Sequence, residues 1–272
     1  MFCCTDSELA LTKRFEGAYA RSKQPVMQAI EHQVCGCDYG GNSWTTRKQA
    51  DALIGLLGLG AGTNLIDLGA GTGWPGLYLA EKSACTVTLV DLPEIGLRLA
   101  KRRAKEDGLR DRVSIKNADA ADLPFAAESF DAVGHSDLLC CLVRKNTVLQ
   151  ECRRVVCKRG RMAFTVISIA PDLSRTQRAR AIANAPEFVE TEADYRSLLE
   201  STGWRLEKWN DLTEDYAQSC ARQIEADTSR QDQLAELLGS SEARERLAGW
   251  HSKLGAIRDG LFLRELFVCR PC

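Results

Sequence analysis

The hydrophobic positions of this chain change their period along its length, and the changes outline the secondary structure. Four short runs, at residues 65–68, 86–90, 113–116 and 130–133, have the length and the β-branched content of buried strands. The intervening segments favour helices of about 10–15 residues. The alternation of strands and helices from residue 65 to residue 169 predicts an α/β fold with a doubly wound parallel sheet.

Beyond this core the chain changes character. Two further strand-like runs, 204–209 and 261–269, are separated by a polar, helix-prone insertion at 213–258. This insertion and a shorter one at about 170–191 would emerge at the sheet edge where a ligand binds, so both are predicted to form a lid. Before the core, helices are expected at residues 8–20, from residue 25 onward and at residues 46–57.

The run LIDLGAGTG carries an apolar strand into a turn with three glycines. Gly69, Gly71 and Gly73 have no side chain to block a ligand and can adopt positive φ, so the backbone can pass close beneath an adenosine-bearing molecule. Trp74-Pro75 is expected to open the next helix, with Pro75 at its first position. A strand that ends here would place the ligand at the carboxyl edge of the sheet.

An acidic residue follows the turn at a suitable distance. Asp91 ends the run TVTLVD about 20 residues later, where a carboxylate commonly binds the hydroxyls of a ribose. The glycines also fit a G-x-G-x-x-G pattern if it starts at Gly71 and ends at Gly76, but not if it starts at Gly69. The turn and the acid therefore predict an adenosine cofactor without choosing which one.

Three runs in order resemble one family: LIDLGAGTGWPGLYLA, then VTLVD, then NADAADLPFAAESFDAV. They are similar to the class I S-adenosylmethionine-dependent methyltransferases, in particular the small-molecule group (methyltransferase domain type 11) that includes ubiquinone and glycine or sarcosine methyltransferases. The resemblance covers residues 39–168. It departs where the family usually has Pro-Gly-Gly, because here Lys158 and Arg159 precede Gly160.

The resemblance implies a Rossmann-like sheet of seven strands, six of them parallel and the last, at 261–269, antiparallel. The organisation that it implies is a helical cap with a cofactor-closing loop (residues 1–60), an S-adenosylmethionine-binding core (61–169) and a C-terminal half of the core with the lid insertions (170–272).

Carried over residue by residue, the resemblance implies a site for S-adenosyl-L-methionine, with S-adenosyl-L-homocysteine as its product. Asp67 and the turn backbone would hold the methionine end, and Asp91 would bind the ribose. Leu92 would lie against the adenine, Asp119 would accept from its exocyclic amine, and the Ala120 N–H would donate to its ring. For each acid alone, a solvated loop or a helix cap is an equally good interpretation. The turn residues assigned in this way are Gly69, Ala70, Gly71 and Gly73.

A loop rich in glycine and hydroxyl side chains occupies residues 38–46. In related methyltransferases the corresponding segment closes over the cofactor, which favours Tyr39, Ser43 and Thr46 as cofactor contacts. A loop that only caps the following helix is the alternative interpretation.

Methyl transfer from a sulfonium needs a general base only if the acceptor must lose a proton. His135 directly follows the fourth strand, so topology makes it the first candidate for this base and also for a cofactor contact. A histidine buried in the core is the alternative. Tyr39 and Asp137 are weaker candidates for the base.

The charge balance excludes some partners. Lys and Arg number 36 and Asp and Glu 37, so no overall field attracts nucleic acid, and no apolar run is long enough to span a bilayer. We expect a cytoplasmic protein with a small-molecule methyl acceptor, no nucleic-acid or membrane partner, and a homodimer as an open option. Most of the 12 cysteines are expected to pack in the core; Cys35 and Cys37 with Cys269 and Cys272 lack the spacing of a zinc site, so no metal is expected.

Three functions are compatible with these patterns. The first is a small-molecule methyltransferase whose accepting atom (N, O, S or C) is unresolved. The second is an NAD(P)-dependent oxidoreductase that would use Gly71, Gly73, Gly76 and Asp91, although an obvious Tyr-x-x-x-Lys pair is lacking. The third is a non-catalytic or repurposed S-adenosylmethionine-binding protein.

Overall fold

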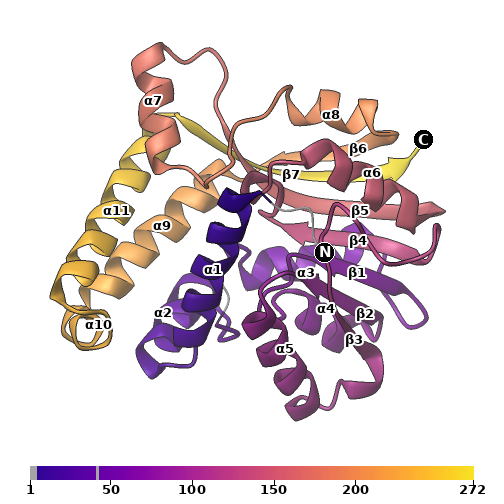
Figure 1. Ribbon diagram of the computed structural model, residues 1–272, viewed down its shortest axis with the longest axis horizontal. Coiled ribbons are helices and arrows are strands. Elements are labelled where there is room, and N and C mark those ends of the chain that lie inside the picture. The colour runs from indigo at the N-terminus through magenta and orange to yellow at the C-terminus, as the bar shows by residue number, and fades with distance from the viewer. Residues whose placement is uncertain (1–4, 41–42) are drawn as a thin grey trace.

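The computed structural model describes residues 5–40 and 43–272. Seven strands form one sheet in the order β3-β2-β1-β4-β5-β7-β6. All neighbours are parallel except β7, which runs antiparallel to both β5 and β6. The predicted doubly wound sheet with an antiparallel seventh strand is confirmed (Figure 1). The strands are β1 (Asn64–Leu68), β2 (Thr86–Asp91), β3 (Val113–Asn117), β4 (Phe130–Ser136), β5 (Val156–Ile169), β6 (Trp204–Asp211) and β7 (Phe262–Pro271).

The alternation of side chains along the strands assigns helices to the two faces of the sheet. Leu65 of β1 belongs to a buried cluster with side chains of α3 (Arg47–Leu57), α4 (Gly76–Ser83) and α5 (Glu94–Glu106). Its neighbour Ile66 points to the other face, where α6 (Lys145–Val155) and α8 (Tyr195–Ser201) cover the sheet. The fold therefore has three layers, with the sheet between two sets of helices.

Local signals set several helix boundaries. The helix α1 (Asp6–Arg21) begins at a capping box between Thr5 and Glu8, and α2 (Pro25–Cys35) ends at Gly36, which adopts a left-handed conformation. Pro75 was expected at the first position of the next helix, but α4 begins one residue later and Pro75 is its N-cap. Short 3-10 turns lie at Arg110–Arg112 (η1) and Leu139–Cys141 (η2).

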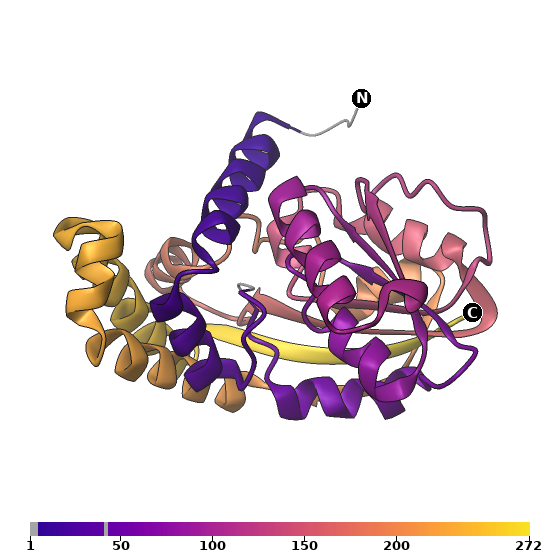
Figure 2. The same cartoon turned by 90° about the horizontal axis from the view of Figure 1, so that it is seen from below.

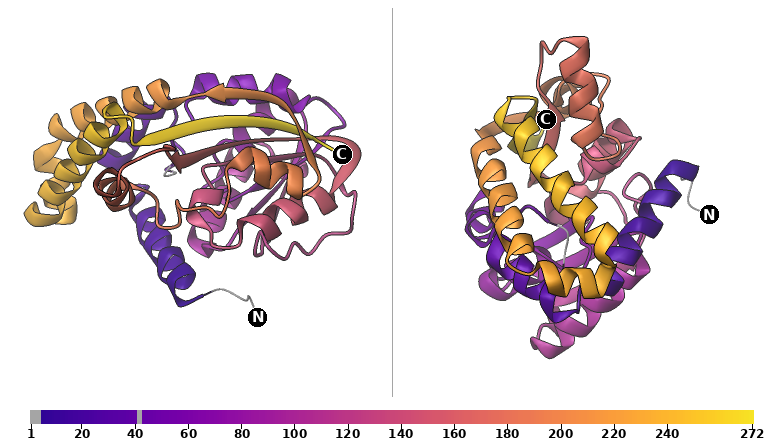
Figure 3. Two further views of the ribbon diagram at one scale, coloured as in Figure 1. Left: turned by 90° about the horizontal axis from the view of Figure 1, so that it is seen from above. Right: turned by 90° about the vertical axis from the view of Figure 1, so that its left-hand side faces the viewer.

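The remaining helices form a lobe beside the carboxyl edge of the sheet. The two predicted insertions contain α7 (Arg175–Asn184) and the consecutive helices α9 (Thr213–Thr228), α10 (Gln231–Leu238) and α11 (Ser240–Arg258). Figures 2 and 3 show α9–α11 stacked together, with α1 standing between them and the core. A small buried cluster joins α2 to this lobe; it includes Ile30 and Val34 of α2, Ala226 of α9, Leu234 of α10 and Ala243 of α11.

Candidate functional site

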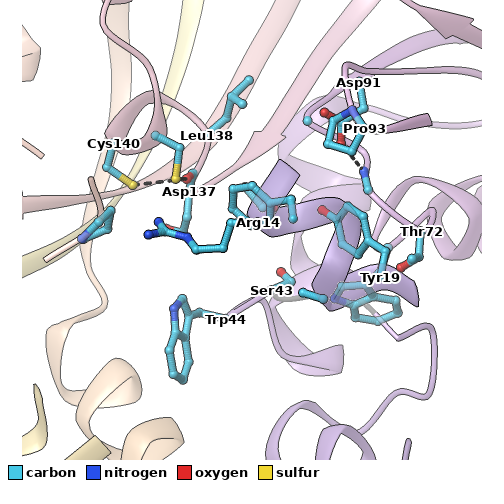
Figure 4. Close-up of a pocket in the computed structure, with 18 of the residues that line it drawn as sticks. Arg14, Tyr19, Ser43, Trp44, Thr72, Asp91, Pro93, Asp137, Leu138 and Cys140 are labelled. Carbon is cyan, nitrogen blue, oxygen red and sulfur yellow. Dashed lines mark hydrogen bonds between the residues drawn. The ribbon is translucent and has the colours of Figure 1, made fainter. Parts of the chain in front are cut away.

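A cavity of about 450 Å³ lies at the carboxyl ends of β1, β2 and β4 (Figure 4). Its strand side is formed by residues at or just after the ends of these strands, and its helical side by residues of α1, α2, α9 and α11. This is the position at which open α/β sheets bind ligands. The volume falls in the usual range for a small-molecule pocket, which is about 300–1,000 Å³.

The glycine-rich turn forms the floor of the cavity. Gly69 and Gly71 have φ values of 67° and 52°, which L side chains rarely adopt, so the tight turn depends on glycine here. Gly69, Ala70 and Gly71 all line the cavity. Gly73 is not among the lining residues: a Cβ there would lie 2.5 Å from Leu77 Cδ1, because its space is taken up by the packing of α4.

Two carboxylates are held against this turn by backbone N–H groups. Asp67 is 3% exposed and accepts from the Gly76 N–H at 3.1 Å, at the start of α4. Asp91 accepts from the Gly71 N–H at 2.7 Å and from the Leu92 N–H at 2.8 Å. Burial raises the pKa of Asp67 to about 7 and that of Asp91 to about 6, because desolvation disfavours the charged carboxylate.

A third carboxylate lies after β3, where the resemblance implied an adenine contact. Asp119 lines the cavity, is 4% exposed and accepts from the Ala121 N–H at 2.8 Å. Arg144 also lines the cavity and pairs with Asp119. Leu92 lines the cavity, whereas Ala120 is not among the lining residues.

The loop before α3 contributes less than expected. Ser43 lines the cavity and its hydroxyl accepts from the Thr45 N–H. Thr46 instead caps α3 through a reciprocal pair with Gln49, which is the alternative interpretation of this loop. Tyr39 packs against Trp74 and under the Arg103 guanidinium, outside the lining of the main cavity. Gly41 and Asn42 of the predicted loop lie outside the described residues.

The structure does not bring His135 to the cavity. Its register opposite Leu68 places its side chain on the α6–α8 face of the sheet, whereas Asp67, opposite Gly134, lies on the other face. The ring is 3% exposed and stacks on Phe164 at 4.6 Å. Burial lowers the pKa of His135 to about 3, so it would be a poor base at neutral pH. The placement predicted from topology is therefore wrong: the strand ends at the site, but this side chain points away from it.

Two further cavity residues have no role assigned from the sequence: Tyr19 lies outside the motifs, and Thr72 lies between two glycines of the turn. Tyr19 of α1 lies against the turn, so that a Cβ added at Gly71 would meet its hydroxyl at 2.8 Å. Figure 4 shows Tyr19 on the side of the cavity occupied by Thr72 and Asp91. The Thr72 hydroxyl is buried and has no hydrogen-bond partner among residues 5–40 and 43–272. The Thr72 hydroxyl thus has an unused hydrogen bond for a ligand on the floor of the cavity.

A buried ion pair supports the edge of the sheet next to the cavity. Asp137, which follows β4 and lines the cavity, pairs with Arg264 of β7 at 2.9 Å. Arg264 is fully buried, and its guanidinium also reaches the side chains of Gln49, Thr165 and Thr45. Because this carboxylate is engaged by a guanidinium, Asp137 is a structural tie between β4 and β7 in this arrangement.

Aromatic side chains from three separate segments form a wall on the helical side. Trp44 packs edge-on against Tyr216 of α9, with ring centroids 5.0 Å apart, and against Trp250 of α11 at 5.5 Å. All three rings line the cavity. Their spacing in the sequence carries no pattern, so only the fold reveals that they belong together.

Among the described residues, no cluster of His, Cys, Asp or Glu has the arrangement of a metal site. Cys35 and Cys37 are both buried at the end of α2, and their thiols point to the Ser43 carbonyl and to Glu31 respectively. None of the described helices is long and apolar enough to cross a membrane.

Comparison with known proteins agrees with the geometry. The family model described as a methyltransferase domain matches residues 66–164. Methyltransferase GfsG of Streptomyces halstedii is 29% identical over 61% of this chain and 62% of its own length. The 27-O-demethylrifamycin SV methyltransferase of Amycolatopsis mediterranei (strain S699) is 28% identical over 62% of this chain and 64% of its own length. The alignments thus span less than two thirds of these relatives.

Solved structures show the same fold over almost the entire chain. The geranyl diphosphate C-methyltransferase from Streptomyces coelicolor A3(2) has a TM-score of 0.73 at 16% identity and covers 99% of both chains. The [4+2]-cyclase SpnF has a TM-score of 0.74 at 20% identity and covers 98% of this chain and 97% of its own. The matched domain, the order of the seven strands and the acids around the glycine turn agree with one another: residues 66–164 of this chain are similar to the methyltransferase-domain family, on a fold that solved methyltransferase structures share.

Proposed function

We propose that this protein transfers a methyl group from S-adenosylmethionine to a small-molecule acceptor. The observation that carries the proposal is the charge of the cavity floor. Three carboxylates, those of Asp67, Asp91 and Asp119, surround the glycine turn, and the guanidinium nearby, that of Arg144, is paired with one of them. Such a floor suits a ligand that brings positive charge.

The same observation argues against a nicotinamide dinucleotide. Its diphosphate would lie on the glycine turn, at the N-terminus of the following helix, and would need the backbone N–H groups there. Here the N–H groups of Gly71 and Gly76 already donate to Asp91 and Asp67. Two carboxylates would therefore face an anionic diphosphate, whereas the sulfonium and ammonium of S-adenosylmethionine would be attracted to them.

The residues present fit the proposed cofactor. Each oxygen of Asp91 accepts one backbone N–H and keeps a lone pair for a ribose hydroxyl. Asp119 is assigned to the adenine amine, and Leu92 to the face of the ring. The orphan hydroxyl of Thr72 and that of Tyr19 supply donors close to the turn. Asp67 is assigned to the methionine end through its negative charge.

S-adenosylmethionine supplies, when bound, an electrophilic methyl group on a positively charged sulfur. The chain itself has to align an acceptor with that methyl group and exclude water, which accounts for most of the rate in a displacement of this kind. With His135 turned into the core, no general base is assigned. Acceptors that react as neutral or already ionised nucleophiles are therefore favoured over those that need deprotonation by the protein.

We assign binding of the methyl acceptor to the helical segments. We place the boundary of this part at residues 1–60 together with about 170–191 and 213–258, because α1, α2, α9 and α11 line the cavity opposite the glycine turn. An ion pair between Arg14 of α1 and Glu187, at 3.2 Å, connects two of these segments beside the cavity. The proposed role of this part is to select the acceptor and to close the site.

Calorimetric titration with S-adenosylmethionine, S-adenosylhomocysteine and NADH tests the proposal. Micromolar binding of both sulfur ligands with no heat from NADH is expected, followed by a mass gain of one methyl group in an acceptor screen. Binding of NADH in preference to the sulfur ligands would overturn the cofactor assignment. Tight cofactor binding without methylation of any acceptor would favour a repurposed protein instead.

A further inference from the structure

The helical side of the cavity contains a lysine that the cofactor assignment does not use. Lys253 lies on α11, one turn after Trp250, so the two side chains emerge on the same side of the helix, and both line the cavity. Its ammonium group donates one hydrogen bond, to the carbonyl of Asn184 at the end of α7. An ammonium has three N–H donors, so two remain for other partners.

The other charged side chains on this side of the cavity are engaged within the protein. Arg14 pairs with Glu187 at 3.2 Å, and Arg246 pairs with the buried carboxylate of Asp227 at 2.7 Å. Asp137 is held by Arg264. The remaining acids here, Glu8 and Glu31, accept hydrogen bonds from backbone N–H groups of Thr5 and Gly40 respectively.

Lys253 differs from these groups because it has no ion pair within the described part of the chain. The thiols of Cys220, Cys140 and Cys141 lie near enough to influence its pKa. Burial lowers the pKa of Lys253, which means that its charged form lacks solvation in this structure. An anion delivered to the cavity would restore that solvation, and the gain would be larger than at an exposed lysine.

The surroundings of Lys253 indicate what else the anion would carry. The wall formed by Trp44, Tyr216 and Trp250 offers apolar ring surface next to it. The buried Trp250 Nε1 also has no hydrogen-bond partner among the described residues. A single ammonium matches a carboxylate, with one negative charge, better than a phosphate monoester, which carries about −1.5 to −2 at pH 7.

Resting on the proposed methyltransferase function, we propose that the methyl acceptor is a small carboxylic acid with an apolar body, whose carboxylate pairs with Lys253 while its body lies against the Trp44–Tyr216–Trp250 wall. Lys253 is then a specificity-determining residue that holds one end of the acceptor. It takes no part in the chemical step.

The test uses shape-matched probes that differ in charge. The protein, saturated with S-adenosylhomocysteine, is titrated with cinnamate and cinnamamide and with 4-phenylbutyrate and 4-phenylbutyramide. Each carboxylate is expected to bind about tenfold to a hundredfold more tightly than its amide, as for hydrogen bonds to a charged group. Phenyl phosphate is the third kind of probe and is expected to bind more weakly than the carboxylates.

Variants test whether the preference for carboxylates over amides depends on Lys253. Lys253→Met should remove the difference between acid and amide, and Lys253→Arg should retain most of it. Lys101→Met, which removes an exposed lysine of α5, is the matched control and should behave as the wild type. Circular dichroism and S-adenosylhomocysteine affinity, both expected to be unchanged in all three variants, report whether each has folded.

The outcomes separate this inference from the function on which it rests. If S-adenosylhomocysteine does not bind the wild type, the proposed function fails. If S-adenosylhomocysteine binds but the carboxylates bind no more tightly than their amides, the acceptor assignment fails. It also fails if neither the carboxylates nor the amides bind. A preference that survives in Lys253→Met, or tighter binding of phenyl phosphate than of the carboxylates, would likewise overturn it.

Discussion

The strand side and the helical side of the cavity hold their functional groups in place in different ways. On the strand side, Asp67 and Asp91 end neighbouring parallel strands and are fixed by backbone N–H groups within the same core. On the helical side, Trp44, Tyr216 and Trp250 come from three segments that are more than 30 residues apart and meet only through packing. The first side is built from local geometry, and the second from tertiary contacts.

This difference matches the tasks that we assign to the two sides. A cofactor that is the same for a whole family can be bound by backbone groups and acids at strand ends, which tolerate little change. An acceptor that differs between relatives is better selected by helix side chains, because they can be replaced without altering the sheet. The predictions below test this division, from the largest expected effect to the smallest.

Removal of the ion pair between β4 and β7 should have the largest effect on stability. Arg264→Met leaves Asp137 as a buried carboxylate without its partner, so the free energy of unfolding should fall by about 3–5 kcal/mol. Urea denaturation measures this change. Arg98→Met, which breaks an exposed pair with Glu94, should change it by about 0.5 kcal/mol or less. Equal effects of the two variants would show that the buried pair has no special structural role.

Loss of the Asp91 carboxylate should weaken cofactor binding more than any single substitution on the helical side of the cavity. Asp91→Ala is expected to reduce S-adenosylhomocysteine affinity by about 1.5–3 kcal/mol, because hydrogen bonds to a charged group are lost. Calorimetry measures this affinity, and Asp111→Ala, at an exposed aspartate in η1, is the control. Affinity at the level of the wild type in Asp91→Ala would contradict the ribose assignment.

Cofactor affinity should depend on pH through the strand-side acids. If the cofactor binds the ionised form of Asp91, whose pKa is raised to about 6, lowering the pH from 7.5 to 5 should weaken binding about tenfold. Asp91→Asn should remove the part of this dependence that comes from Asp91 and leave the part that comes from Asp67, whose pKa is raised to about 7. If the wild-type affinity is constant over this pH range, cofactor binding does not depend on the ionisation of these carboxylates.

The same raised pKa values have the opposite consequence for the free protein. Asp67 and Asp91 bind protons more tightly when folded than when unfolded, where their pKa is about 3.9. Their contribution to stability is therefore present below pH 4 and is lost as the pH rises to about 6 for Asp91 and about 7 for Asp67. Asp67→Asn should reduce this loss in urea denaturation series at several pH values.

The contact of α1 with the glycine turn should have the smallest effect. Tyr19→Phe removes one neutral hydroxyl at the turn, so S-adenosylhomocysteine affinity should fall by about 0.5–1.5 kcal/mol. Tyr39→Phe is the matched control, because the Tyr39 side chain lies outside the main cavity and its loss should leave affinity unchanged. A larger loss in Tyr39→Phe than in Tyr19→Phe would restore the loop before α3 as the cofactor contact.

The sequence alone predicted the sheet, and it predicted the glycine turn and the acids that line one side of the cavity. Strand period, the glycine turn and the acids after the strands are local features, because a residue that ends a parallel strand necessarily lies at the ligand edge. The local pattern also indicates where His135 lies, because alternation along β4 places Val133 and His135 on the same face and Val133 is buried there.

Only the tertiary structure decided which residues from distant segments meet around the cavity. Tyr19 of α1 reaches Gly71 in the glycine turn, Arg264 pairs with Asp137 across 127 positions, and Lys253 meets Asn184 from 69 positions away. No period or spacing connects such residues, since their proximity arises when helices and strands pack around one core. The sequence motifs are therefore sufficient to predict the cofactor. The side of the cavity that we assign to the acceptor depends on contacts that form only when the chain folds.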